Sequence, residues 1–152
     1  MDYFITKDTL LIMPITKTQT KILENENVML VDSKTFKIVN DNCKLYGSTY
    51  LNRVEFSKTI LNCRCKMPII LDNEGNIILF PTTSKRQDHC TWLNIKSYKK
   101  QGYSDVVITF LSGIKIAINM SYYTFERQIN KCHRLKLDYL EKKVLNVYKN
   151  AR

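Results

Sequence analysis

Short apolar runs separated by polar clusters fill the first forty residues. The runs are TLLIMP (9–14), QTKILE (19–24), NVMLVD (27–32) and TFKIV (35–39). The Asn, Asp and Ser residues between them suit tight turns. This part of the sequence therefore predicts four short β-strands.

Two later segments have the pattern of β-hairpins. In residues 67–81, MPIILDNEGNIILFP, two apolar runs flank the turn-forming residues 72–76. In residues 105–120, DVVITFLSGIKIAINM, the chain is predicted to turn at Ser112–Gly113. The return strand alternates as in a half-buried strand of an antiparallel sheet. Its apolar face holds Ile114, Ile116, Ile118 and Met120, and its other face holds Lys115, Ala117 and Asn119.

Two segments have helical periodicity. Between residues 42 and 61, Gly47 would weaken a continuous helix by about 1 kcal/mol relative to alanine. We therefore expect one internal helix with an irregularity at Gly47. A longer helix is predicted from Ser121, a suitable N-cap, to about residue 150. The internal helix is indicated by Cys43, Tyr46, Tyr50 and Val54, which recur at helical spacing.

The predicted C-terminal helix is amphipathic. Lys136 and Lys143 interrupt its apolar face, so we expect that face to be covered only in part, or by another chain. The apolar stripe consists of Phe125, Ile129, Cys132, Leu135, Tyr139, Leu140, Val144 and Val147. The opposite side, a sector of about 80° at about 100° per residue, holds Arg127, Lys131, Arg134, Lys142 and Lys149.

These patterns together predict an α+β fold. It would consist of an antiparallel β-sheet or partly open barrel, with one internal helix and a long C-terminal helix. The length of 152 residues suits a single domain over residues 1–152 with its own core.

Charge narrows the choice of partners. The chain has 24 Lys and Arg against 14 Asp and Glu, a formal net charge of +10. This balance favours acidic partners, with nucleic acid first and an anionic membrane surface second. A surface that is merely solvated is the alternative. No run approaches the length of a membrane helix, about 18 apolar residues, and no signal peptide is expected, so we predict a cytoplasmic, nucleoid-associated protein.

Catalytic and metal-binding patterns are weak. The sequence has no GxSxG, P-loop, GxGxxG or HExxH motif, and His89 and His133 stand alone. Five cysteines at irregular spacing suit reduced thiols better than a disulfide framework. The CRC of residues 63–65 lacks the spacing of a zinc knuckle. We expect no enzyme activity, no catalytic residue, no cofactor and no metal site.

Nucleic-acid binding has local support in several segments. After Cys90, alternation places basic and aromatic residues on one strand face, where they could stack on bases or hold a backbone. The alternative is that Trp92 belongs to the core. That face consists of Trp92, Asn94, Lys96, Tyr98 and Lys100.

Further candidates for phosphate contact lie in two loops and on the last helix, although each also suits an ordinary solvated surface. No helix-turn-helix or basic-zipper pattern is evident, so recognition of DNA would use the minor groove or duplex shape. The candidates are Arg64 and Lys66, Lys85 and Arg86, and Arg127, Lys131 and Arg134.

Four blocks of sequence resemble the ComK family of competence transcription factors. They are NCKLYGSTYLNR (42–53), PIILDNEGNIILFPTTS (68–84), CTWLNI (90–95) and INMSYYTFERQI (118–129). The resemblance covers roughly residues 9–135. It implies a bacterial activator of genes for DNA uptake. Such proteins bind paired A-rich and T-rich boxes, mainly through the minor groove, as dimers that pair on DNA.

The resemblance also implies candidate contacts to DNA. Arg53 matches the family's arginine after its GSSY block and is the first candidate for insertion into the groove. Gly47 would keep this helix slim against DNA; the alternative is that Gly47 permits close packing inside the domain. Under this hypothesis, Arg53→Ala weakens DNA binding by about 1–3 kcal/mol and leaves the fold intact. Lys44, Ser48, Thr49 and Asn52 complete the candidate set.

The sequence departs from the family pattern at its end. Longer members carry a further C-terminal segment that adaptor proteins of the degradation machinery recognise, whereas this chain stops at Arg152. Adaptor-driven turnover, and self-association through that segment, are expected only where the segment is present. RNA polymerase is a further expected partner. Two alternatives stay open: a non-specific single-stranded nucleic-acid-binding module, and a regulatory paralogue that pairs with a full-length activator.

Overall fold

The computed structural model describes most of the chain, namely residues 3–25, 27–83, 89–95, 99–101, 106–110 and 113–150. For residues 99–101 and 147–150, only the backbone is described. Three predicted contact residues, Lys85, Arg86 and Lys96, lie outside the described residues.

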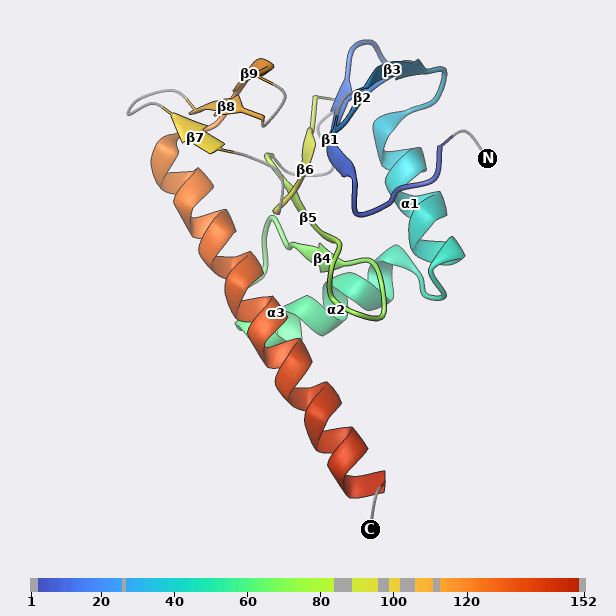
Figure 1. Ribbon diagram of the computed structural model, residues 1–152, viewed down its shortest axis with the longest axis vertical. Helices are drawn as coiled ribbons and strands as arrows, with labels where there is room; N and C mark the ends of the chain where they lie inside the picture. The colour runs from blue at the N-terminus through green and yellow to red at the C-terminus, as the bar shows by residue number, and fades with distance from the viewer. Residues whose placement is uncertain are drawn as a thin grey trace.

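A six-stranded antiparallel sheet forms the centre of the molecule (Figure 1). Its strands are β1 Thr9–Pro14, β2 Thr20–Glu24, β3 Val28–Val31, β4 Ile69–Ile70, β5 Ile78–Pro81 and β6 Trp92–Asn94. The order across the sheet is β3–β2–β1–β6–β5–β4, so β3 and β4 form its edges and the sheet stays open. The first three strands and the hairpin of residues 67–81 are confirmed.

A second, three-stranded sheet consists of β7 Lys99–Gln101, β8 Val106–Thr109 and β9 Lys115–Ile118. In β9 the side chains of Ile116 and Ile118 are buried, while Lys115 and Ala117 are exposed. The predicted alternation of the return strand is therefore confirmed.

The structure has three helices in the described part of the chain, α1 Thr35–Leu45, α2 Tyr50–Leu61 and α3 Tyr122–Asn150. The strand predicted for residues 35–39 is wrong, because these residues open α1. A five-residue run is too short to reveal its period. The helical period becomes visible only over the longer span, in the buried residues Thr35, Ile38, Val39, Asn42 and Cys43.

The sequence predicts a single internal helix, but the structure has two helices in its place, α1 and α2, divided at Gly47. Gly47 has φ +103°, a backbone conformation that residues with a Cβ rarely adopt, and no atom would lie within 4 Å of an added Cβ. The glycine therefore serves the turn between the helices and not a close contact. The α+β class is confirmed.

The six-stranded sheet is covered on both faces, because successive strand residues point to opposite sides. On one side it packs against α1 and the start of α2, and on the other against α3 and the smaller sheet. The first side contains Ile12, Ile22, Leu79 and Trp92 with Ile38 and Tyr50. The second contains Leu11, Leu23, Phe80 and Leu93 with Ile108, Phe125 and Leu135.

The last helix, α3, begins as the sequence predicts. The hydroxyl of Ser121 accepts a hydrogen bond from the backbone N–H of Thr124 at 3.1 Å, which caps the helix. Phe125, Cys132 and Leu135 are fully buried. The C-terminal part of α3 extends past the rest of the molecule (Figure 1). In the part of the chain that the structure describes, no helix is both long enough and apolar enough to cross a membrane.

Candidate nucleic-acid interface

The strand face around Trp92 is part of the core and not a binding surface. Trp92 and Asn94 are each 1% exposed. The Trp92 ring packs edge-on against Tyr50, with centroids 6.1 Å apart, and the Asn94 amide donates to the Thr9 carbonyl at 3.0 Å. The predicted stacking face is therefore wrong at these two positions. Its other members, Lys96, Tyr98 and the side chain of Lys100, lie outside the described residues.

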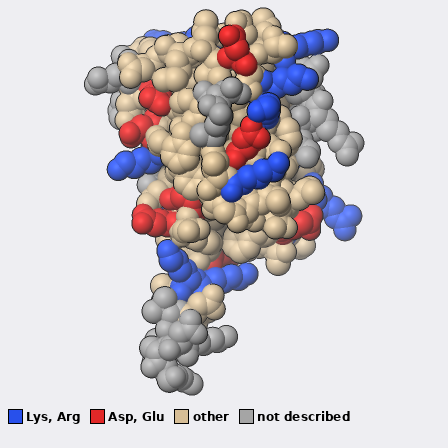
Figure 2. Space-filling view, turned by 90° about the vertical axis from the view of Figure 1, so that its right-hand side faces the viewer, with Lys and Arg blue, Asp and Glu red and all other residues tan. Residues whose placement is uncertain are grey.

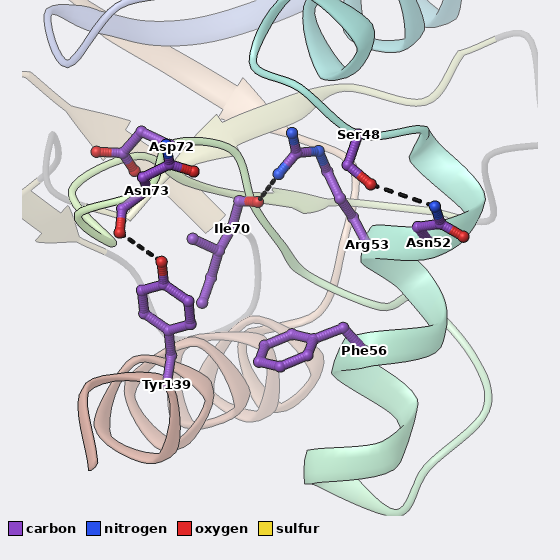
Figure 3. Close-up of a pocket in the computed structure, with 8 residues that line it drawn as sticks. All are labelled: Ser48, Asn52, Arg53, Phe56, Ile70, Asp72, Asn73 and Tyr139. Carbon is purple, nitrogen blue, oxygen red and sulfur yellow. Dashed lines mark hydrogen bonds between the residues drawn. The ribbon is translucent and has the colours of Figure 1, made fainter. Parts of the chain in front are cut away.

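Arg53 is tied into the protein by its guanidinium group (Figure 3). Its Nη1 donates to the Ile70 carbonyl at 2.8 Å, and its Nη2 donates to the Cys43 carbonyl at 3.0 Å. Cys43 lies in the last turn of α1, and its carbonyl also accepts from the backbone N–H of Ser48 at 3.2 Å. Carbonyls at the end of a helix favour a nearby cation. Arg53 thereby joins α1, α2 and β4.

The insertion of Arg53 into a DNA groove stays a prediction, and the geometry of the side chain argues against it. Both terminal nitrogens are bound to backbone carbonyls, and the buried Nε has no hydrogen-bond partner in the described structure. A guanidinium held in this way would have to break internal bonds to reach DNA. We therefore expect its loss to affect stability, contrary to the expectation from sequence.

The residues beside Arg53 mainly cap α2. The Thr49 hydroxyl accepts from the backbone N–H of Asn52 at 3.1 Å, and the Asn52 amide donates to the Ser48 hydroxyl at 3.3 Å. Lys44, Thr49 and Asn52 are exposed, and Ser48 is half-buried. Arg53, Ser48 and Asn52 line a small cavity with Phe56, Ile70, Asp72, Asn73 and Tyr139 (Figure 3).

A second group of predicted residues is brought together at the loop that follows α2. We call this group the cationic surface; its members are Arg64, Lys66, Arg127, Lys131 and Arg134. The Lys131 ammonium donates to the Cys65 carbonyl at 3.1 Å, so α3 lies against a loop 66 residues earlier in the chain. Arg64, Lys66, Arg127 and Arg134 are exposed. The structure thus unites two sets of candidates that the sequence left separate.

Gln128 connects α3 to the loop that follows α2. This residue was not among the candidates predicted from the sequence. It is 1% exposed, and its amide donates to the Lys66 carbonyl at 3.0 Å and to the Pro81 carbonyl at 2.8 Å. Lys66 has φ +51°, an uncommon conformation for lysine that this contact helps to hold. The sequence did contain a signal for this role, because Gln128 is a polar residue one helical turn from Phe125 and Cys132, on the buried side of the apolar stripe.

The cationic surface borders a groove whose lining includes basic residues and no acidic residue. A groove of about 260 Å³ is lined by Leu61, Cys63, Arg127, Asn130, Lys131 and Arg134, none of which is acidic. Cations gathered around a groove attract anions over a longer range than isolated ones. On the face in Figure 2, Lys and Arg side chains are intermixed with Asp and Glu.

Two buried thiols, Cys43 and Cys132, are held in the protonated form. Burial raises the pKa of the Cys43 thiol to about 11, a shift that the neighbouring Arg53 guanidinium only partly opposes. Burial also raises the pKa of Cys132. Among the described residues, no group of three or more His, Cys, Asp or Glu could hold a metal ion.

These features define a class of protein: small, basic and α+β, with an open sheet buried on both faces and a grooved cationic surface along its last helix.

Comparison with known proteins shows the family. A protein-family model described as "ComK protein" matches residues 1–143. The competence transcription factor of Bacillus subtilis (strain 168) is 30% identical over 129 residues, which cover 83% of this chain and 67% of that protein. The chain belongs to the ComK family, as the sequence blocks indicated. No solved structure matches it.

Proposed function

We propose that this protein is a double-stranded DNA-binding transcription activator of competence genes. It binds paired A-rich and T-rich boxes, mainly through the minor groove, and self-associates as a dimer on DNA. It works in the cytoplasm, without a cofactor or a catalytic step, and with RNA polymerase as a further partner. Membership of the ComK family and the 30% identity with a competence transcription factor support this proposal.

The observation that carries the proposal is the assembly of the cationic surface. Lys and Arg neutralise phosphates, and Arg is the side chain that narrow A·T-rich minor grooves attract. Three of the five residues are arginines with exposed side chains, Arg64, Arg127 and Arg134. These arginines replace Arg53 as the first candidates for groove contact. Lys66 and Lys131 supply further phosphate attraction.

A competition binding assay tests the function. Purified protein would be titrated by gel shift against a duplex with paired A/T boxes, a scrambled duplex of equal composition, and a single strand. The proposal predicts the highest affinity for the paired boxes, and a loss when their spacing changes by half a helical turn, about five base pairs. Equal affinity for the scrambled duplex would refute it.

The single strand in that assay tests the main alternative, a non-specific module for single-stranded nucleic acid. This alternative needs aromatic side chains on which bases can stack. Trp92, its principal candidate, is buried in the core. We therefore expect the single strand to bind more weakly than either duplex.

A further inference from the structure

The C-terminal part of α3 carries a second apolar stripe that remains exposed. Leu137, Leu140 and Val144 are 60%, 38% and 67% exposed. They lie on a different side of the helix from Phe125, Cys132 and Leu135, which pack into the core. At about 100° per residue, the two stripes are separated by about 120° around the helix axis. One helix thus has one apolar face for its own domain and another that the described structure leaves uncovered.

The spacing of the second stripe is that of a coiled coil. Leu137, Leu140 and Val144 follow the alternating three- and four-residue steps of heptad positions a and d, and Val147 continues the steps in the sequence. This part of α3 contacts the body of the molecule on another side, because the Lys143 ammonium donates to the Asn73 carbonyl at 3.0 Å and the Lys142 ammonium lies 5.9 Å from the centroid of the Phe56 ring. These contacts leave Leu137, Leu140 and Val144 exposed, so a second helix can lie along the stripe.

The charges beside the stripe indicate which partner fits. With Leu137 at position a, Lys136 and Lys143 occupy g positions and Glu141 occupies an e position. In a parallel pair of this helix with itself, Lys136 faces Glu141 of the partner subunit, and opposite charges meet. In an antiparallel pair, g positions face g positions and lysine would meet lysine. The pattern is therefore complementary to a second copy of the same chain in parallel orientation.

We propose that this stripe joins two copies of the protein through a short parallel coiled coil. The inference deepens the self-association within the proposed function and rests on it. This contact between the stripes of two copies, which we call the seam, is short and buries little surface, so we expect a weak dimer in solution. Two copies bound to neighbouring boxes have a high effective concentration, and the seam would then close on DNA.

Sedimentation of the full chain without DNA tests the seam, with a matched pair of variants. Val144→Lys places a charge in the stripe. Asn146→Lys introduces the same charge two residues further on, at an exposed residue outside positions a and d. We expect Val144→Lys to raise the dimer dissociation constant by at least about tenfold and Asn146→Lys to change it by less than about twofold. A dimer that resists both substitutions would place the interface elsewhere and overturn the proposal.

A charge exchange tests the orientation. Glu141→Lys should weaken the dimer, because it puts lysine opposite Lys136 of the partner subunit. The double variant Lys136→Glu with Glu141→Lys should restore it, because each pair is then opposite again. In an antiparallel dimer the double variant would restore nothing, and that result would refute the parallel seam.

DNA binding separates failure of the seam from failure of the proposed function. Val144→Lys should bind a single A/T box as the parent protein does, but lose the gain in affinity that a second box provides. The seam would be overturned, with DNA binding intact, by two results together. The parent protein would be monomeric in solution, and a second box would raise its affinity by no more than it raises that of Val144→Lys. A parent protein with no preference for A/T boxes would refute the function, while sedimentation would still decide the seam.

Discussion

At the scale of single residues, one arginine shows how a sequence motif can be structural. Arg53 occupies the position that the family resemblance marks for DNA contact, yet its guanidinium bonds to the carbonyls of Cys43 and Ile70. An arginine can satisfy two carbonyls from different elements because its donors form a rigid, planar fork. The side chain therefore joins α1 to β4.

The first prediction concerns this arginine. Arg53→Ala should lower the free energy of unfolding by about 2–4 kcal/mol, because two part-buried carbonyls lose a charged donor. Denaturant unfolding followed by circular dichroism measures the change. Lys58→Ala in the same helix is the control, since its ion pair with Glu55 is exposed and should contribute little. An Arg53→Ala variant as stable as the control would contradict the structural role.

The second prediction concerns alkaline pH. Burial raises the pKa of Cys43 from 9.0 to about 11 and that of Tyr50 to about 12 in the folded protein. Because the unfolded thiol ionises at lower pH than the folded one, the contribution of Cys43 to stability is constant below about pH 9 and falls between pH 9 and 11. Unfolding curves at these pH values measure the fall, and Cys43→Ala should make it shallower. A fall of equal steepness in that variant would argue against the buried thiol.

At the scale of elements, the contact between α3 and the loop after α2 creates the cationic surface. The basic residues of each element, taken alone, also suit an ordinary solvated surface. Gln128 brings them together by donating to carbonyls of the loop and of the end of β5. Its position inside an apolar stripe is consistent with this role, because a buried amide needs hydrogen-bond partners.

The third prediction tests Gln128 as a positioning residue. Gln128→Ala should destabilise the protein by about 2–3 kcal/mol, because two carbonyls lose their donor. It should also weaken DNA binding under conditions in which the variant is folded, since Arg64 and Lys66 move relative to α3. Asn146→Ala, an exposed amide in the same helix outside the groove, is the control. If the folded Gln128→Ala variant binds DNA as the control does, the loop does not take part in binding.

At the scale of the whole molecule, the distribution of charge matters more than its total. The net charge of +10 is spread over the chain, and acidic residues balance cations on the face in Figure 2. The cations along the groove of α3, whose lining includes no acidic residue, are the ones expected to displace counterions from DNA. Binding should therefore depend on where a lysine or arginine lies.

The fourth prediction follows from this distribution. Each phosphate contact contributes about 0.9 to the slope of log affinity against log salt concentration. The double variant Arg127→Ala with Arg134→Ala should reduce that slope by about two. Lys37→Ala with Lys58→Ala removes the same charge from residues paired with Asp41 and Glu55, and should leave the slope unchanged. Equal reductions in both variants would mean that net charge alone governs binding.

Local pattern alone determined much of the architecture. The first three strands, both hairpins, the Ser121 cap and the long last helix follow from period, turn residues and capping. These features depend on neighbours in the chain. The family, too, was evident from sequence blocks. The helix at residues 35–45 was missed, because a short apolar run does not distinguish a strand from a helix.

Only the tertiary structure decided which candidate residues meet. From the sequence alone, Trp92, Arg53 and Arg127 are equally good candidates for contact with nucleic acid, since each lies among polar or basic residues. Packing buried Trp92 between a sheet and a helix, tied Arg53 to two carbonyls, and left Arg127 exposed beside a groove. These outcomes depend on contacts between segments far apart in the chain. No local pattern contains that information.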